Sequence, residues 1–356
     1  MRKQLSILAL SAVALLVLAG CTPPMPDSLK VELAERTVQC SDGFVEAKFL
    51  PEMIDVGDFW NSSMDVACEG AMGLLVSDQY PEGSGIVITE ENVTGCTPYA
   101  AVPIAVDAAV FSFYFEEIYE VNLSPKILSG IISGSITEWS DPAIQGINSA
   151  VEFPDLPINL IKSAPPGAIS AMGIWLGSEV GSAVDMSGFS PSGSSEVDAL
   201  YELTEGDLKL TSYAALQIAA ANYANMVLDE SNLESVVLPD VLTIQTGIGQ
   251  TKLTGEGSFL SFEYDPSIPA QPLPGQFEAI EPWGALYPVT MYLCGSDELQ
   301  TRFVARFLLR LDSQGSISTG VFNPVLESIR VAAISVVAVG LPEVEIPEEL
   351  IQELEG

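Results

Sequence analysis

Residues 160–176, LIKSAPPGAISAMGIWL, place a lysine and a glycine directly before an apolar stretch of helical character. Free backbone N–H groups at a helix N-terminus attract anions, and a nearby lysine adds positive charge. Pro165 and Pro166 interrupt this segment, and a proline has no N–H to donate. The segment therefore predicts an anion-binding loop in which part of the usual donor set is missing.

Other kinds of chemistry are excluded by what the chain lacks. It contains no histidine, so Ser-His-Asp and Cys-His catalytic arrangements cannot be built and a zinc site of the usual kind is not expected. The sequence also has no CxxC pair and no glycine-rich nucleotide loop. We therefore expect no catalytic residues, no metal and no cofactor, and the protein is not predicted to be an enzyme.

The N-terminus has the pattern of an export signal. A short basic start precedes an apolar run at 5–18, which is shorter than the roughly 20 residues that span a bilayer as a helix, and LAGC follows. We interpret residues 1–20 as a lipoprotein signal peptide, Cys21 as the lipidated residue and 21–35 as a tether. A plain signal peptide and an uncleaved anchor are the alternatives. The predicted location is the cell membrane, lipid-anchored and facing outside the cytoplasm.

The remaining cysteines and the charge agree with export. An even number of cysteines outside the cytoplasm indicates two disulfides, and three pairings are open. The candidates are Cys40, Cys68, Cys96 and Cys294. A formal charge of −35 repels nucleic acid, so no nucleic-acid partner is expected. The 48% of hydrophobic residues excludes a disordered chain, and residues 336–356 form an acidic C-terminal tail.

Apolar runs and turn signals predict alternating strands and helices. Strands are expected at 36–41, 73–78, 85–92, 99–113, 154–162 and 287–294. Helices are expected after the N-caps Ser124 and Asp141, each followed by proline, and at 168–184, 211–228 and 297–311. This alternation predicts an α/β fold with two lobes and a ligand cleft between them. Residues 36–105 with 285–335 are assigned to lobe 1, and residues 106–284 to lobe 2.

Residues 122–148, NLSPKILSGIISGSITEWSDPAIQGIN, and 153–161, FPDLPINLI, carry a family resemblance. They resemble the phosphate-binding lipoproteins of Pst-type ABC transporters, in which L-x-x-I-x-x-G-x-I-x-x-W is followed by (S/N)DPAI and an apolar strand. The return segment, with Tyr287-Pro288 and FVARFLLRLDSQG at 303–315, is compatible. The resemblance implies the type II periplasmic-binding-protein fold and phosphate bound between two lobes. It also implies delivery to ABC permease subunits by a monomeric protein.

The family's binding segment reads Arg-Ser-Asp-Gly-Ser-Gly-Thr-Thr after the apolar strand. Laid on this sequence, its first seven positions fall in order on Lys162, Ser163, Ala164, Pro165, Pro166, Gly167 and Ala168. The resemblance thus implies ligand contacts from Lys162, Ser163, Gly167 and Ala168. Two hydroxyls are absent, and lysine lacks the bidentate fork of arginine. Weakened phosphate binding or an altered specificity is therefore expected.

In the same family, three strand ends of the first lobe contribute a Ser or Thr, a Ser, and an Asp that accepts the proton of hydrogen phosphate. By element order these positions correspond to Ser41, to Ser77 with Asp78, and to Thr89 with Glu90. The acceptor carboxylate would be Asp78 or Glu90. Ordinary loop polarity is the alternative for each position.

Two hypotheses of function follow. The first is an extracytoplasmic solute-binding lipoprotein of an ABC importer, which binds phosphate or a related oxyanion by lobe closure with weakened or altered specificity. The second is a related surface scaffold or regulatory lipoprotein that no longer binds a small ligand. The lost hydroxyls favour the second, and ligand-induced stabilisation distinguishes the two.

Overall fold

The computed structural model describes residues 34–35, 37–192, 195–233, 235–318 and 321–345. The expected signal peptide, Cys21, most of the tether and the end of the acidic tail lie outside the described residues. Residues 39–341 form one compact unit, and the description below concerns this unit. Every helix in the described ranges is too short or too polar to reach across a bilayer.

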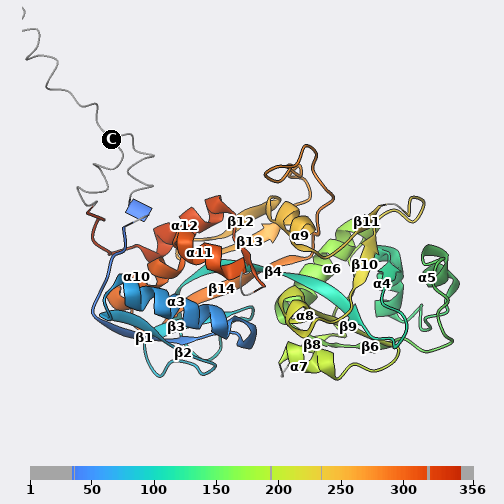
Figure 1. The fold of residues 1–356 in the computed structure, drawn as a ribbon, viewed down its shortest axis with the longest axis horizontal. Helices are drawn as coiled ribbons and strands as arrows, with labels where there is room; N and C mark the ends of the chain where they lie inside the picture. Colours follow the sequence, from blue (N-terminus) through green and yellow to red (C-terminus); the bar gives the residue numbers. More distant parts are fainter. Residues whose placement is uncertain (1–33, 36, 193–194, 234, 319–320, 346–356) are drawn as a thin grey trace, which may run out of the picture. The chain divides into compact units, whose positions relative to one another are not determined.

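The centre of the unit is the long strand β4 (Pro98–Phe113), which is buried along almost its whole length. Its near-continuous apolar sequence is typical of a strand covered on both faces. The first part of β4 pairs antiparallel with β14 (Leu286–Cys294), and its last five residues pair antiparallel with β9 (Asp207–Ser212). One strand therefore runs through both lobes of the fold (Figure 1).

The sheet of the first lobe combines parallel and antiparallel strands. Strands β1 (Gly43–Lys48), β2 (Met72–Ser77) and β3 (Gly85–Thr89) run parallel, and β14 lies antiparallel to β3. The hairpin of β12 (Thr251–Glu256) and β13 (Phe259–Tyr264) extends the same sheet through Phe259 and Ala101, and β15 (Asn323–Pro324) also pairs with β4. The associated helices are η1 (Pro51–Met53), α3 (Ile54–Ala67), α10 (Leu299–Leu308), α11 (Leu311–Ile317) and α12 (Glu327–Val337).

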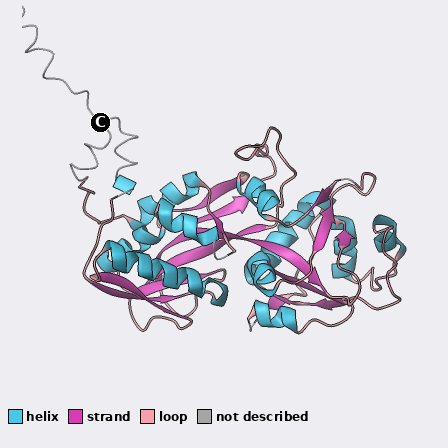
Figure 2. Ribbon diagram, in the orientation of Figure 1, coloured by secondary structure: helices cyan, strands magenta, loops and turns pink. Residues whose placement is uncertain are grey.

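The second lobe places helices around shorter strands (Figure 2). Its strands are β5 (Val121–Leu123), β6 (Asn159–Ile161), β7 (Ser163–Ala164), β8 (Ser190–Pro191), β9, β10 (Ala224–Val227) and β11 (Val236–Val237). Its helices are α4 (Pro125–Ser133), α5 (Pro142–Ile147), α6 (Pro166–Val180), α7 (Glu196–Tyr201) and α8 (Tyr213–Ala219), while α9 (Val241–Ile248) leads into the hairpin. The residue boundaries predicted for the two lobes stay a prediction.

Several expected elements are confirmed. Ser124 and Asp141 cap α4 and α5, with each side chain accepting a backbone N–H and proline at the first helical position. The strands expected at 73–78, 85–92, 99–113 and 287–294 are β2, β3, β4 and β14.

Two element predictions were wrong. The strand expected at 36–41 is absent from its described residues, and the first strand begins at Gly43, where Val45 and Ala47 alternate into the core. The helix expected at 211–228 is instead the end of β9, the short helix α8 and β10. Pairing of β9 with β4 overrides the helical propensity of this alanine-rich segment.

Both expected disulfides are present. Cys40 bonds to Cys68, and Cys96 bonds to Cys294, with Cα–Cα distances of 5.6 and 5.7 Å. The first tethers the chain before β1 to the end of α3, and the second joins the approach to β4 with the end of β14. Tertiary structure selects this pairing from the three that the sequence left open.

Candidate functional site

A cleft of about 360 Å³ lies where the carboxyl ends of β1, β2 and β3 meet the N-terminus of α6 and the segments next to α7 and β9. Because β1 pairs parallel with both β2 and β3, all three strands end at the same edge of the sheet. Ligands of open α/β sheets commonly bind at such an edge. The cleft is thus lined by both lobes, and we take it as the candidate site.

Three of the predicted ligand residues line this cleft. Asp78 follows β2, and Thr89 and Glu90 lie at the end of β3. Neighbouring Ser77 is engaged locally, because its hydroxyl donates to the carbonyl of Gln79 and accepts the N–H of the same residue. Ser41 precedes β1 rather than ending it. The strand end expected at Ser41 is instead formed by Lys48.

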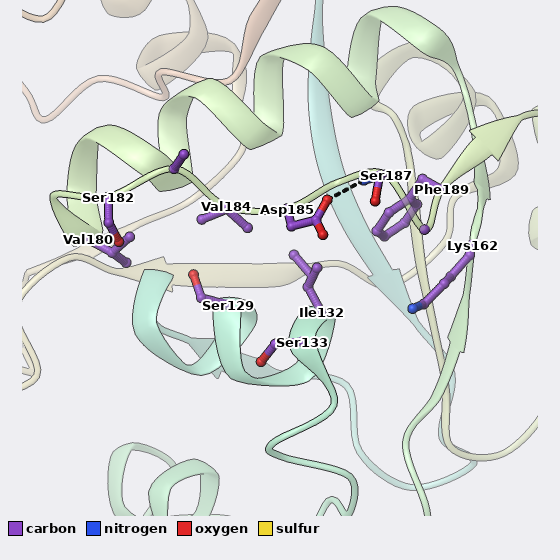
Figure 3. A pocket seen from close by; sticks show the side chains of 12 residues that line it. Ser129, Ile132, Ser133, Lys162, Val180, Ser182, Val184, Asp185, Ser187 and Phe189 are labelled. Carbon is purple, nitrogen blue, oxygen red and sulfur yellow. Dashed lines mark hydrogen bonds between the residues drawn. The ribbon is translucent and has the colours of Figure 1, made fainter.

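The predicted cation of the second lobe faces elsewhere. Lys162 is exposed and borders a separate pocket of about 580 Å³, formed by α4 and the segment after α6. Figure 3 shows its side chain directed toward that pocket, on the same side as Ser133 and Phe189. Successive side chains of an extended segment point to opposite faces. The position after β6 therefore turns Lys162 away from the face that Ser163 occupies.

The other predicted residues of this loop are close to the cleft but are largely covered. Ala168 is fully buried, and the carbonyl of Ser163 accepts a hydrogen bond from the ammonium of Lys209. At Gly167, an added Cβ would lie 2.4 Å from Cδ2 of Tyr287. The ring of Tyr287 therefore packs directly on the N-terminus of α6.

The start of α6 lacks the donors of a typical anion site. Pro165 is the N-cap without a side-chain hydrogen bond, and Pro166 is the first helical residue. Neither residue has an N–H, so two of the groups nearest the cleft cannot donate. Both prolines line the cleft, opposite Glu90 and Glu91 of the first lobe. The expected loss of donors is thus located at the cleft wall.

Carboxyl groups dominate the cleft and its floor. The Tyr287 hydroxyl donates to Oε1 of Glu90 at 3.4 Å, and Asp107 pairs with Tyr287 across β4 and β14. Burial, then the field of Asp107, raises the pKa of Glu90 well above its usual range. Burial also raises the pKa of Asp107 to about 7, against the N–H groups of Ala108 and Ala214 that favour its charged form.

Two further carboxyl groups come from opposite lobes. Glu52 follows β1 in η1, and burial raises the pKa of its carboxyl group. Glu196 begins α7 and is almost fully buried. It forms an ion pair with Lys209 at 3.2 Å and accepts the Thr211 hydroxyl at 2.8 Å. Lys209 is therefore committed to Glu196 and to the Ser163 carbonyl.

Sequence reasoning missed five residues of this region. They are Lys48, Glu52, Asp107, Glu196 and Tyr287. Misplacing the first strand hid Lys48 and Glu52, which follow its true end. Asp107 could have been recognised from the sequence, because it is the one acid within the apolar segment of β4. Nothing local marked Glu196, which tertiary folding brings to the cleft.

Comparison with known proteins places this geometry in context. No family model matches the chain. The curated phosphate-binding proteins PstS2 of Mycobacterium bovis (strain BCG) and PstS 2 of Mycobacterium tuberculosis are each 24% identical over 192 residues, which cover 49% of this chain and 50% of theirs. The chain thus spans about half the length of the curated relatives it matches. These matches confirm the resemblance to phosphate-binding proteins.

Solved structures extend the likeness across most of the chain. A high-affinity periplasmic phosphate-binding protein, PfluDING, solved with phosphate, is 16% identical, with a TM-score of 0.52 over 87% of this chain and 98% of its own. The phosphate-binding protein of Stenotrophomonas maltophilia is 13% identical, with a TM-score of 0.50 over the same shares of 87% and 98%. The expected two-lobe fold of periplasmic phosphate-binding proteins is therefore confirmed.

Proposed function

We propose that the chain is an extracytoplasmic solute-binding component of an ABC importer, with a ligand site in the cleft between the lobes and a specificity altered away from phosphate. The cleft at the shared end of β1, β2 and β3 carries this proposal, because elements of both lobes line it. The fold of periplasmic phosphate-binding proteins supports it. Ligand capture would proceed by closure of the lobes, without covalent chemistry.

The location and partners belong to the same proposal. The two disulfides support a compartment outside the cytoplasm. The LAGC motif that ends at Cys21, a lipobox, supports attachment to the membrane. Membrane permease subunits would receive the solute from the closed form. The names of the matched proteins describe binding proteins rather than enzymes, which supports a transport role for this chain.

Weak phosphate binding follows from the cleft's donors and charges. A desolvated dianion needs several N–H or O–H donors, while Pro165 and Pro166 supply no N–H and Lys162 faces another pocket. Each carboxyl group that ionises in the cleft repels an anion, and Lys48 is the one cation among the described residues that line it. We therefore expect phosphate to bind weakly.

A surface scaffold without a small ligand is the second candidate. The replacement of donors by Pro165 and Pro166 favours it, because the N-terminus of α6 then offers fewer N–H groups to an anion. Such a protein would keep the two-lobe fold while its cleft stays empty of solute. Ligand binding separates this candidate from the receptor.

The test is calorimetric titration of the full chain, purified in detergent, with phosphate, sulfate, phosphonate and amino-compound libraries. The receptor proposal predicts saturable binding of one solute class and a melting temperature that rises with its concentration. The dissociation constant for phosphate should exceed about 10 μM, which means a binding free energy of less than about 7 kcal/mol. Absence of heat and of thermal shift with every class would favour the scaffold.

A further inference from the structure

The cleft has the wrong sign for an anion. Among its lining residues that the structure describes, five carry carboxyl groups and one carries an ammonium group. The acids are Glu52, Asp78, Glu90, Glu91 and Glu196, and the cation is Lys48. A cleft lined by one sign of charge concentrates ions of the opposite sign. This lining therefore favours a positively charged solute.

A buried carboxyl group with an incompletely paired oxygen lies beneath the cleft lining. Asp107 is 1% exposed, and its Oδ1 accepts the N–H groups of Ala108 and Ala214. Its Oδ2 makes no hydrogen bond of good geometry within the described part of the chain, while the nearby Tyr287 hydroxyl partly offsets the rise in the pKa of Asp107. A buried acceptor left without a donor costs free energy. A ligand that donates an N–H to this oxygen would remove that cost.

The register of the sheet shows where this oxygen lies. Asp107 stands directly opposite Tyr287 in the antiparallel pair of β4 and β14, so both side chains project from the same face. On that face Tyr287 packs against Gly167 and donates its hydroxyl to Glu90, which lines the cleft. Asp107 is therefore directed toward the cleft floor, beneath Glu90 and the N-terminus of α6.

The arrangement suits an organic cation better than a metal ion. Within the described ranges, no three acidic or cysteine side chains converge closely enough to hold a metal. The carboxyl groups instead come from η1, the end of β3 and α7, on several sides of the cleft. Spaced acceptors match a molecule with several N–H donors. A volume of about 360 Å³ accommodates a small molecule of this kind.

The cleft already contains one ammonium group in a suitable setting. Nζ of Lys48 lies 5.0 Å from the centroid of the Tyr80 ring, and both residues line the cleft. Ammonium groups are attracted to the faces of aromatic rings. The neighbouring cation, Lys209, lies behind the lining and is paired with Glu196. Its charge is therefore not available to hold an anion in the cleft.

We propose that the cleft binds a small aliphatic amine in its protonated form, with an ammonium group that donates to Glu90 and to Oδ2 of Asp107. This inference rests on the proposed receptor function and names its solute class. Glu52 lines another side of the cleft and can accept a hydrogen bond from a second ammonium or from a hydroxyl group, while Glu196 stays paired with Lys209. The ligand is recognised by its N–H donors and positive charge, properties that phosphate lacks.

Binding of such a cation is coupled to proton release. The charges of Asp107 on β4, Glu52 in η1 and Glu196 on α7 raise the pKa of Glu90, and the hydrogen bond from Tyr287 on β14 lowers it. The cations of this region are Lys209 on β9, which is paired with Glu196, and Lys48 at the end of β1. Burial and the field of Asp107 raise the pKa of Glu90, so the empty cleft favours the neutral form of this carboxyl group. An entering ammonium favours its charged form. Amine affinity therefore rises with pH.

The experiment is calorimetric titration of the full chain in detergent with putrescine, spermidine, phosphate and sulfate. Because the chain carries a formal charge of −35, titrations are run at about 150 mM salt to screen attraction to its surface. We expect one of the amines to bind with a one-to-one stoichiometry, and its affinity to increase as pH rises through the pKa of Asp107, about 7. Neither anion should compete with it.

Matched variants locate the binding. Glu90→Gln and Glu52→Gln each remove one charge from the cleft with little change in shape, and Glu120→Gln removes one charge from an exposed position. Glu90→Gln should weaken amine binding by about tenfold or more, and Glu120→Gln by less than about twofold. Melting curves of each variant confirm that it is folded before the titration.

The outcomes separate this inference from the receptor proposal. Amine binding that is reduced by Glu90→Gln and Glu52→Gln but not by Glu120→Gln supports both. Equal effects of the three variants would show attraction to the acidic surface and would overturn the amine site. Phosphate binding tighter than any amine would overturn it too, while leaving the receptor role intact. Binding of neither class by a folded protein would overturn both proposals.

Discussion

Asp107 is the one acid in a strand that otherwise consists of apolar and small polar side chains. Its burial disfavours the charged form, and the N–H groups of Ala108 and Ala214 offset only part of that penalty, because the pKa still rises to about 7. A carboxyl group kept at this cost in the middle of β4 weakens the fold unless a ligand uses it. This makes Asp107 the most informative single residue of the cleft.

The free energy of unfolding should depend on the protonation of Asp107. In the unfolded chain this group ionises near about pH 4, whereas in the folded protein its pKa is raised to about 7. The folded state therefore holds the proton more tightly. Asp107 does not destabilise the fold below about pH 4, where it is protonated in both states. As pH rises to about 7, its ionisation lowers the free energy of unfolding by up to about 4 kcal/mol. Urea unfolding across this window measures the change.

Asp107→Asn is the control for this prediction, because it keeps an oxygen for the two N–H donors and cannot ionise. Carboxyl groups far from Asp107 titrate alike in both proteins, whereas the pKa of Glu90 should fall in the variant because the field of Asp107 is removed. The stability of the variant relative to the wild type should therefore rise with pH and then level off above about pH 7. A difference that stays constant from about pH 4 to pH 8 would contradict the raised pKa.

At the scale of elements, the N-terminus of α6 shows how a common anion site is altered. The helix is in the expected place, but Pro165 and Pro166 occupy its cap and first position, and Tyr287 covers Gly167. Any side chain at Gly167 would displace the Tyr287 ring and with it the hydrogen bond to Glu90. The helix end thus supports the carboxyl cluster instead of presenting N–H groups to an anion.

The two disulfides should differ in how much they stabilise the fold. Cys96–Cys294 closes a loop with a sequence separation of 198, and Cys40–Cys68 one of 28. In the chain-entropy model the longer loop contributes about 2 kcal/mol more. Replacing Cys96 and Cys294 together by alanine should lower the free energy of unfolding by about 2–5 kcal/mol.

Urea unfolding of the two double-alanine variants, one for each disulfide, makes this comparison directly. Both lose two sulfur atoms, so they differ mainly in the loop that is released. A larger loss for the Cys40 and Cys68 pair would show that local packing, and not loop length, determines the contribution of each disulfide.

At the scale of the whole molecule, β4 passes through both lobes and places Asp107 beneath the cleft. Its pairing changes from β14 to β9 between Ala108 and Ala109, one residue beyond Asp107. Motion of one lobe against the other would therefore bend the chain next to the buried carboxyl group. Under the proposed function, ligand contacts near this point would act on both lobes at once, as closure on a solute requires.

The proposed membrane attachment concerns the whole chain and depends on its N-terminus. Cys21→Ser should release the protein from membranes, because the lipid would have no thiol to join. Fractionation of cells that express the wild type and this variant measures it, with Ser6→Ala in the same leader as the matched control. Persistent attachment of the Cys21→Ser variant would contradict the lipobox interpretation.

Much of the fold could be predicted from local patterns. The apolar run of β4, the proline-preceded caps Ser124 and Asp141, and strand β14 are all determined within short windows of sequence. The absence of histidine likewise excluded whole classes of catalysis without any structure. Element order and the family resemblance predicted that Asp78, Thr89 and Glu90 lie at strand ends beside the ligand site, and these residues line the cleft.

The character of the cleft was decided only by tertiary structure. Glu90 meets Tyr287 across a separation of 197 residues, and Glu196 reaches the cleft from the other lobe. Lys162 carried the expected charge at the expected position, yet strand alternation turns it into a different pocket. Periodicity and caps act within a few residues, whereas the sign of a cleft is the sum of charges that distant segments bring together. The sequence therefore determined most of the elements of the fold, and only the folded structure determined which charges line the cleft.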